Sequence, residues 1–291
     1  MDVRKYEAFQ KAVEFGNLSR AADFLGYTQP AVSQMISSME DEFAVKLLIR
    51  SRTGVRLTPE GERLLPHIEE VVARDRVLHN MVDEIRGLDS GTIRIGSITC
   101  VSNCWLPRLI GEYQKNYPKI QFEIRQGDYG SVAQWIKAGL VDFGFLNPGA
   151  AFGLATVPIK KDELLALMPA GHCLAAFERV PLEMLARERF ILLGRGFCSE
   201  ILAAFDERGL KPLIQYRIPD AFTVMAMVEQ GLGVSAMADM LLGRQSYALE
   251  LRPIEPRVER TISVAFRDRD ALPIAAKHFI DLVRSMEGLL A

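Results

Sequence analysis

The sequence predicts a chain of three parts: a small all-α module, one long helix, and a two-lobed α/β domain. Apolar residues recur at helical spacing up to Phe43, a four-three seam runs from Leu64 to Ile85, and strands alternate with helices from Thr92 onward. We expect these parts to take residues 1–58, 59–90 and 91–291. Within the last part, one lobe is expected over 91–161 and 267–291 and the other over 162–266.

The composition is that of an ordinary globular protein. Of 291 residues, 49% are hydrophobic and 25% charged, which argues against extended disorder. No apolar run reaches the roughly 18–20 residues of a membrane helix, no signal-peptide core is present, and no cysteines form a CxxC pair. We therefore expect a cytoplasmic chain with reduced thiols. The net charge of −2 does not indicate nucleic acid, so any positive surface must be local.

Three short helices are expected at the start of the chain. The first covers residues 3–15 with Asp2 as its N-cap, and the second runs from about Ser19, which can cap it, to Leu25. Gly26 ends this second helix, and Thr28 can cap a third.

The third helix has two different faces. An apolar stripe, expected to pack inward, recurs at intervals of four, three and four and consists of Val32, Ile36, Met39 and Phe43. The opposite face is small or neutral polar: Gln29, Pro30, Ser33, Gln34 and Ser37. A helix that enters the major groove needs a slim face with hydrogen-bonding tips, and Gln can bond adenine N6 and N7 together. The alternative is an ordinary surface helix of a three-helix bundle.

A basic hairpin follows this helix. Between Phe43 and Pro59 lie four basic residues and no acidic one, namely Lys46, Arg50, Arg52 and Arg56. The segment LLIRSRTGVRLT predicts two short strands with Thr53-Gly54 at the turn. Such a hairpin beside a helix-turn-helix is a wing that reaches phosphates or the minor groove. A merely solvated loop would not explain the absence of acidic residues.

A long helix is expected after the wing, with Thr58 as its N-cap and Pro66 kinking its second turn. Its seam, apolar except for one aspartate, predicts self-pairing, because the small bundle before it cannot cover six turns. The alternative is a helix packed on its own domain. The seam comprises Leu64, Ile68, Val71, Asp75, Leu78, Val82 and Ile85, and a hinge is expected at 89–91.

From residue 92 the strand–helix alternation predicts a largely parallel sheet in two α/β halves. Ligands in open α/β sheets sit beyond the carboxyl ends of strands, so we expect a cleft between the halves.

The run NLSRAADFLGYTQPAVSQMISSMEDEFAVKLLIRSRTGVRLTPEG resembles the N-terminal signature of the LysR-type transcriptional regulators, a winged helix-turn-helix. The resemblance implies a surface that reads DNA. The chain departs from the family at one position, because many relatives carry Arg where this chain has Gln34. The expected DNA-binding residues are Ser19, Thr28, Gln29, Pro30, Ala31, Ser33, Gln34, Ser37, Arg50, Arg52 and Arg56.

The stretch from residue 91 resembles the LysR-type effector domain, which is similar to periplasmic binding proteins; IRIGSI and GLGVSAM carry the likeness. The resemblance implies promoter DNA, a small-molecule effector, RNA polymerase and further copies of the chain, as dimer or tetramer, as partners. It also implies the effector-binding residues Ile98, Thr99, Cys100, Val101, Ser102, Asn103, Gly127, Asp128, Asn147, Phe222 and Thr223. Each of these could instead merely cap a helix.

No catalytic, metal or cofactor site is expected. The four histidines show no HxH or HExxH spacing, there is no GxSxG, and the GxGxxA match at 231–236 follows a helix where the dinucleotide motif must follow a strand. Two alternatives stay open: a binding protein or enzyme that uses its N-terminus only to dimerise, and a thiol-based redox regulator acting through Cys198. The second lacks a resolving cysteine after Cys198.

Overall fold

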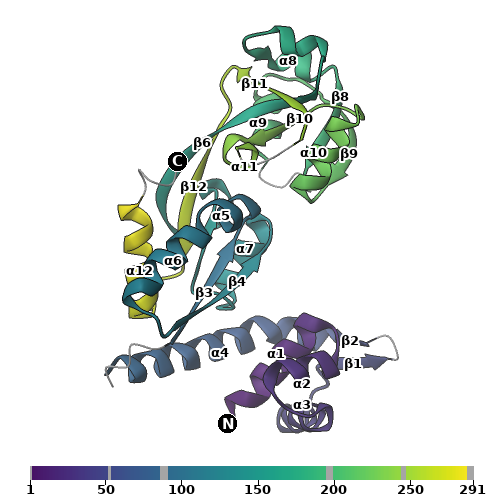
Figure 1. Ribbon diagram of the computed structural model, residues 1–291. Coiled ribbons are helices and arrows are strands. Elements are labelled where there is room, and N and C mark those ends of the chain that lie inside the picture. Colours follow the sequence, from purple (N-terminus) through teal and green to yellow (C-terminus); the bar gives the residue numbers. More distant parts are fainter. Residues whose placement is uncertain (1, 52–53, 86–90, 195–198, 244–246, 287–291) are drawn as a thin grey trace. The chain divides into compact units, whose positions relative to one another are not determined.

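The computed structural model describes residues 2–51, 54–85, 91–194, 199–243 and 247–286, apart from the side chains of residue 80 and of residues 83–85. The chain divides into two compact units, residues 1–91 with 137–140, and residues 92–136 with 141–291 (Figure 1). Among the described helices, none is both long enough and apolar enough to cross a bilayer.

The first unit is a helical bundle followed by a hairpin and a long helix. Its elements are α1 (Val3–Phe15), α2 (Leu18–Leu25), α3 (Gln29–Phe43), β1 (Leu48–Ser51), β2 (Gly54–Leu57) and α4 (Pro59–Ile85). Asp2 and Thr28 cap α1 and α3 as predicted. The cap of α2 differs, because the Asn17 side chain accepts from the backbone N–H of Ser19 and Arg20 at 2.8 and 3.1 Å. Helix α2 therefore begins one residue earlier, and Ser19 lies inside it.

The predicted hairpin is present. Strands β1 and β2 pair antiparallel from Leu48–Leu57 to Ser51–Gly54, while Thr53 lies outside the described residues. The backbone N–H of Val55 donates to the Gly16 carbonyl at 2.9 Å, which fastens the hairpin to the end of α1. A Cβ at residue 54 would lie 2.3 Å from that same oxygen, so only glycine permits the approach.

Helix α4 continues without interruption past Pro66. The Thr58 hydroxyl caps it as predicted, accepting from the Gly61 N–H at 2.9 Å.

The second unit has two lobes joined by long strands (Figure 1). The first lobe contains β3 (Gly91–Ser97), α5 (Thr99–Cys104), α6 (Leu106–Asn116), β4 (Ile120–Gln126), α7 (Tyr129–Lys137), β5 (Phe143–Leu146), η1 (Pro148–Ala150) and α12 (Ile274–Ser285). The second contains η2 (Cys173–Ala176), β7 (Val180–Pro181), α8 (Leu182–Leu185), β8 (Arg189–Leu193), α9 (Glu200–Glu207), β9 (Leu213–Ile218), α10 (Ala221–Glu229), β10 (Ser235–Ala238), α11 (Asp239–Leu242) and β11 (Leu249–Glu255).

Two strands run between the lobes, β6 (Ala155–Pro169) and β12 (Glu259–Phe266). Residues 155–163 of β6 pair with β12, and residues 164–169 pair with β10 and β11. Because Ser263–Ala265 of β12 also pair with β5, this strand is part of the first lobe's sheet, although it lies before the expected lobe boundary at 266/267.

The large sheet is mixed, so the prediction of a largely parallel sheet was wrong. Its order is β4-β3-β5-β12-β6-β11-β7, with β10 also on β6. β3 and β5 are parallel, but β12 runs antiparallel to both of its neighbours, because the chain passes from lobe to lobe through β6 and returns through β12. The predicted two-lobed α/β architecture behind a winged helical module is nevertheless confirmed. One apolar core surrounds Phe143 and Phe279 and continues to Val224 of α10 in the second lobe, and another surrounds Phe190 and Phe205 within the second lobe.

Candidate functional site

One face of α3 is exposed to solvent, and the opposite face is buried in the bundle. Val32, Ile36 and Met39 are fully buried, whereas Gln29 and Gln34 are exposed. None of the other predicted DNA-binding residues in this region is buried. Ser19, Thr28 and Pro30 are exposed, and Ala31, Ser33 and Ser37 are partly exposed. The structure thus collects the predicted residues of α3 on one slim polar surface.

Arg50 joins the wing to this surface. From β1, its Nη1 donates to the Ser33 hydroxyl at 2.6 Å and its Nη2 donates to the Ser37 hydroxyl at 3.1 Å. In the free protein these two hydroxyls therefore serve the wing as acceptors. The guanidinium group lies on the polar face of α3, so helix and hairpin form a single surface. Sequence spacing did not predict this brace.

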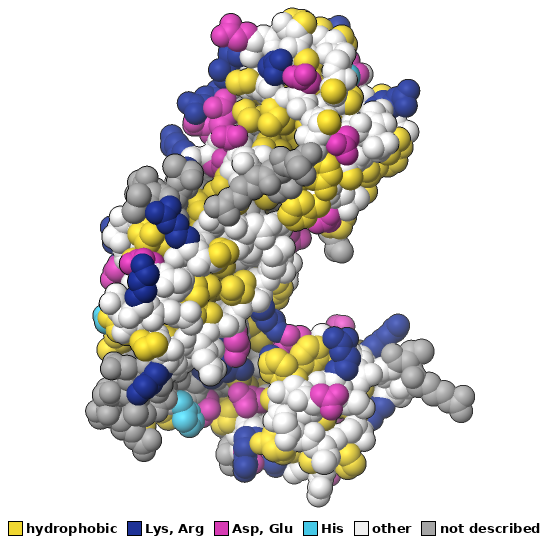
Figure 2. All heavy atoms as spheres, viewed as in Figure 1, with side chains coloured by type: hydrophobic (Ala, Val, Ile, Leu, Met, Phe, Trp, Pro, Cys, Tyr) yellow, Lys and Arg dark blue, Asp and Glu magenta, His cyan; other side chains and the backbone are white. Residues whose placement is uncertain are grey.

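The wing presents a concentration of positive charge. Figure 2 shows Lys and Arg side chains gathered about the β1–β2 hairpin, where Arg50 and Arg56 are exposed and the Lys46 side chain is 70% exposed. Arg52 lies outside the described residues.

A buried carboxylate supports the base of the wing. Glu40, 3% exposed, accepts from the backbone N–H of Leu47 and Leu48 at 2.8 and 3.1 Å through Oε1, and from Lys46 Nζ at 2.9 Å through Oε2. Burial alone would raise the pKa of Glu40, but these hydrogen bonds outweigh it and lower the pKa. The acidic residue beside the wing is therefore structural and its charge is compensated within the protein.

The predicted seam of α4 splits into two halves. Ile68 is 5% exposed inside the core of the bundle, and Leu64 and Val71 pack against that core, so for this half the interpretation of a helix packed on its own domain holds. The small N-terminal bundle therefore covers more of α4 than we expected from the size of the bundle. Leu78 and Val82 are 59% and 36% exposed, while the side chain of Ile85 lies outside the described residues.

Several predicted effector residues belong to the protein interior instead. Ile98, Cys100 and Val101 are at most 6% exposed and line the main apolar core, because the expected loop is in fact helix α5. Thr99 Oγ1 accepts from Gln126 at 3.1 Å, and Asn103 is exposed. Ser102 Oγ is buried and has no hydrogen-bond partner among the described residues.

Other members of that set support helices and turns. Asp128 Oδ1 accepts from the Ser131 N–H at 2.8 Å in the first turn of α7, and Thr223 donates from both its N–H and its hydroxyl to Asp220 at the start of α10. At Gly127 a Cβ would meet the Trp135 ring at 2.7 Å. Phe222 packs partly buried against the main core.

Asn147 takes part in a polar contact between the lobes. Its Nδ2 donates to Glu200 Oε1 at 2.9 Å, and the Tyr129 hydroxyl donates to the same oxygen at 3.1 Å. Glu200 is the first residue of α9 in the second lobe, whereas Tyr129 and Asn147 belong to the first lobe. One carboxylate oxygen thus receives two donors from the opposite lobe.

A buried ion pair lies next to this contact. Arg260 of β12 donates to Asp162 Oδ2 of β6 from Nε at 3.0 Å and from Nη2 at 2.7 Å, and both side chains are at most 10% exposed. Nη2 also reaches Cys100 Sγ at 3.0 Å, and Nη1 reaches the Tyr129 hydroxyl at 3.5 Å. Burial raises the pKa of the Cys100 thiol, so this sulfur is a neutral neighbour and no reactive thiolate.

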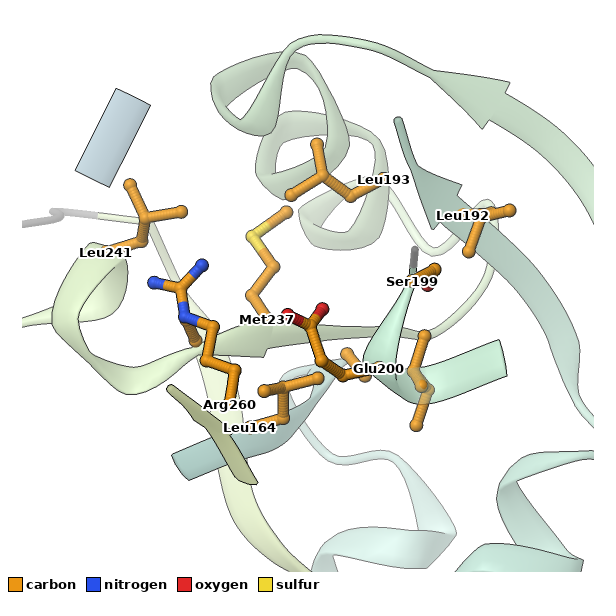
Figure 3. A pocket seen from close by; sticks show the side chains of 11 residues that line it. Leu164, Leu192, Leu193, Ser199, Glu200, Met237, Leu241 and Arg260 are labelled. Carbon is orange, nitrogen blue, oxygen red and sulfur yellow. The ribbon is translucent and has the colours of Figure 1, made fainter. Parts of the chain in front are cut away.

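A small cavity of about 70 Å³ adjoins these groups. Figure 3 shows the Glu200 carboxylate and the Arg260 guanidinium both directed into it. Its walls are otherwise largely apolar: Leu164, Leu192, Leu193, Ile201, Met237 and Leu241, with Ser199 at one side. Sequence reasoning missed Tyr129, Glu200 and Arg260; Tyr129 directly follows the predicted Gly127-Asp128, but no motif marks the other two.

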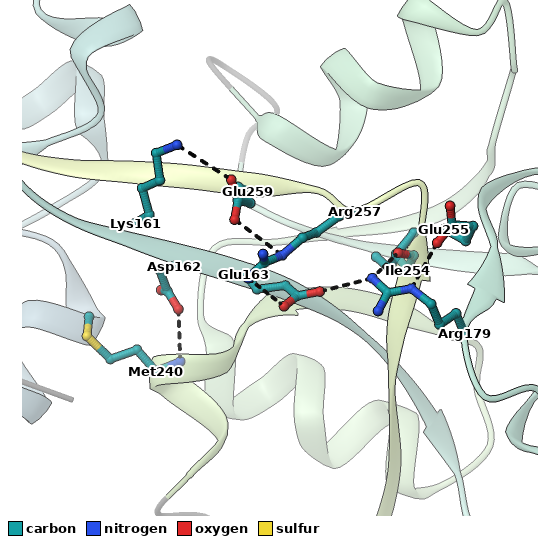
Figure 4. Close-up of polar contacts among 9 residues, drawn as sticks. All are labelled: Lys161, Asp162, Glu163, Arg179, Met240, Ile254, Glu255, Arg257 and Glu259. Atoms are coloured by element: carbon teal, nitrogen blue, oxygen red, sulfur yellow. Dashed lines mark hydrogen bonds and ion pairs between the residues drawn. The ribbon is translucent and has the colours of Figure 1, made fainter.

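The strands between the lobes carry a chain of ion pairs on their exposed side (Figure 4). Glu163 pairs with Arg257 at 3.1 Å and Arg179 at 3.4 Å, and Glu259 pairs with Arg257 at 3.2 Å and Lys161 at 3.9 Å. These contacts tie β6 to the start of β12 where the chain passes between the lobes.

One group of potential metal ligands lies apart from the cavity. His172, Cys173 and Glu188 have ligand atoms within 4.8 Å of one another. His172 Nδ1 already accepts from the Leu174 N–H at 3.3 Å, so this ring serves as the cap of η2. A search for metal-binding motifs in the sequence does not find this group, because two of its residues are adjacent and the third comes from a separate segment.

The family models match nearly the whole chain. Residues 3–62 match the bacterial regulatory helix-turn-helix of the lysR family, and residues 86–287 match the LysR substrate binding domain. The chain belongs to the LysR family. The resemblance inferred from the N-terminal run is thereby confirmed, and this LysR-type protein is a DNA-binding transcriptional regulator with an effector domain.

Curated relatives align with this LysR-type regulator from end to end. It is 29% identical to the uncharacterized HTH-type transcriptional regulator YvbU of Bacillus subtilis over 99% of both chains. It is 28% identical to the transcriptional dual regulator GltC of the same organism, over 97% of this chain and 96% of GltC. Both relatives are transcriptional regulators.

Solved structures share the fold of this LysR-type regulator. A full-length OxyR variant from Pseudomonas aeruginosa has a TM-score of 0.73 at 23% identity, covering 99% of this chain and 95% of that one. Full-length CbnR in complex with its target DNA has a TM-score of 0.67 at 20% identity, covering 98% and 99%. HinK, a LysR family regulator from Pseudomonas aeruginosa, has a TM-score of 0.61 at 27% identity, covering 98% of each chain.

Proposed function

We propose that this regulator reads promoter DNA with the exposed face of α3 and holds the backbone with the wing. The Arg50 brace to Ser33 and Ser37 carries this proposal, because it makes the polar helix face and the basic hairpin one continuous surface. Gln29 and Gln34 then reach base edges, and Arg56 and Arg52 contact phosphates. The residues proposed to surround them are Ser19, Thr28, Pro30 and Ala31.

The remaining parts take the roles of a linker and a sensor. Residues 1–58 form the DNA-binding module, 59–90 link and pair two chains, and 91–291 respond to a small molecule. In a dimer the exposed end of α4, at Leu78 and Val82, is the proposed contact. RNA polymerase is the proposed partner that turns promoter binding into a change of transcription.

The DNA proposal is tested by fluorescence anisotropy on fragments of the promoter upstream of the regulator's own gene. The Arg56→Ala variant should weaken binding to every duplex and reduce the salt slope by about one, because one phosphate contact is lost. Gln34→Ala should instead change base preference at one position of each half-site, at about 1–3 kcal/mol. Arg217→Ala, an exposed arginine of the effector domain, is the matched control and should bind like the wild type.

A binding constant independent of salt, or Arg56→Ala and Arg217→Ala variants that behave alike, would contradict this use of the wing. Equal base preferences of the wild type and Gln34→Ala would contradict the role of α3.

A further inference from the structure

The cavity in the second lobe, which Arg260 of β12 also lines, contains one carboxylate oxygen with no partner among the described residues. Both hydrogen bonds of Glu200 go to Oε1, and no ion pair of this residue is found in the described part of the chain. In a cavity whose other side chains are mostly apolar, Glu200 Oε2 therefore has no donor of its own among the described residues. A half-buried carboxylate oxygen gains much from a charged donor, because a charge-assisted hydrogen bond offsets the cost of removing the carboxylate from bulk water.

The neighbouring cation cannot bind a further acidic group as readily. Arg260 already donates from Nε and Nη2 to Asp162, from Nη2 to Cys100 and from Nη1 to Tyr129. Its charge is balanced by Asp162, so among the described residues that line the cavity Glu200 adds one net negative charge. An anionic ligand would meet Glu200, and the described lining residues offer no second cation to offset it.

We infer that the effector of this regulator carries a protonated amino group on an apolar body, and that Glu200 Oε2 binds that group. This inference rests on the proposed sensing role of residues 91–291. The apolar walls formed by Leu193, Met237 and Leu241 suit the body of such an amine. A cavity of about 70 Å³ holds little more than the amino group, whereas ordinary ligand sites span about 300–1,000 Å³.

Binding of the whole amine must therefore enlarge this cavity. Glu200 is the residue that the ligand and the first lobe share, since Tyr129 and Asn147 hold its other oxygen. A ligand changes the balance between two conformations only through contacts that differ between them. The amine thus acts on the carboxylate that ties the lobes together, which couples its binding to their separation.

The test is thermal unfolding and calorimetry of the full-length protein with small probes. The probes are propylamine, butylamine and 2-phenylethylamine, with the alcohols and carboxylates of equal length as controls. We expect at least one amine to raise the Tm, and the matched alcohols and carboxylates to leave it unchanged. Glu200→Gln keeps an oxygen for Tyr129 and Asn147 but removes the charge, so the amine should bind about tenfold to hundredfold more weakly.

Glu207→Gln removes the same charge from the exposed end of the same helix and should bind the amine like the wild type. A Tm rise with carboxylates instead of amines, no rise with any amine, or equal amine affinity in wild type and Glu200→Gln each overturns the inference. DNA binding by the same samples, measured without probes, tests the proposed DNA surface separately. A protein that binds promoter DNA but ignores every amine refutes only the inference about the effector.

Discussion

Two carboxylates, Glu40 and Asp162, are buried and stabilise the fold, although their positions among charged residues in the sequence suggest exposed side chains. Glu40 belongs to an acidic cluster in the sequence, yet it is buried and accepts two backbone N–H groups at the start of the wing. Asp162 lies among charged residues of β6, yet it is 6% exposed and compensates Arg260. Each carboxylate satisfies buried donors, so its loss leaves those donors uncompensated.

We expect Glu40→Gln to lower the free energy of unfolding by about 2–4 kcal/mol at pH 7, because the charge that Lys46 and two N–H groups require is lost. The folded protein lowers the pKa of Glu40, so its contribution is complete above the ordinary value near 4.5 and fades as pH falls through the folded value. Urea unfolding at several pH values measures this. Glu42→Gln, whose side chain is 46% exposed, is the control and should change stability little. A difference between Glu40→Gln and wild type that grows in acid would refute the interpretation.

Asp162→Asn should cost about 3–5 kcal/mol of unfolding free energy, since a buried guanidinium loses its counter-charge. The exposed pair Arg269–Asp281 has the same chemistry and a 2.7 Å contact, so Asp281→Asn serves as the control and should cost less than about 1 kcal/mol. Chemical denaturation of both variants separates the two cases. Equal costs would mean that burial of the Arg260 pair is unimportant.

At the scale of elements, α4 combines two functions along one seam. Its first half completes the core of the DNA-binding bundle through Ile68, and its second half leaves Leu78 and Val82 exposed. Exposed apolar side chains at this spacing are typical of a helix that pairs with another helix. The surface available for the proposed pairing is therefore shorter than the heptad pattern alone predicts.

Leu78→Glu should shift the protein toward smaller assemblies at micromolar concentration, because it would place a charge in the apolar surface proposed for pairing. Sedimentation velocity gives the mass of the species in solution. Leu213→Glu replaces a leucine of similar exposure, 57%, on β9 and is the control. If Leu78→Glu sediments as the wild type does, α4 does not pair through this residue.

For the whole molecule, a paired α4 would hold two recognition helices at a defined separation. Two such helices require half-sites about 34–36 Å apart, or a multiple, which is about 10–10.5 base pairs for each turn. Because DNA is helical, a change in the distance between two half-sites also rotates one half-site relative to the other.

We expect an insertion of about 5 base pairs between the half-sites to weaken binding strongly, and an insertion of about 10 to restore much of it. Electrophoretic mobility shifts on three matched duplexes measure this. A smooth decline with spacer length, without recovery at a full turn, would show that the two modules are not held in register.

The local patterns of the sequence determined the elements of the DNA-binding module and, through the LysR signature, the family. Caps, the apolar stripe of α3 and the acid-free hairpin all depend on residues a few positions apart, so the sequence contains them directly. Only the tertiary structure decided that Arg50 braces α3, that Ile68 is core, and that β12 runs antiparallel between the lobes. It also brought Tyr129, Asn147, Glu200 and Arg260 into contact from distant parts of the chain. Contacts between distant segments depend on how strands and helices pack, and short-range periodicity carries no information about that packing.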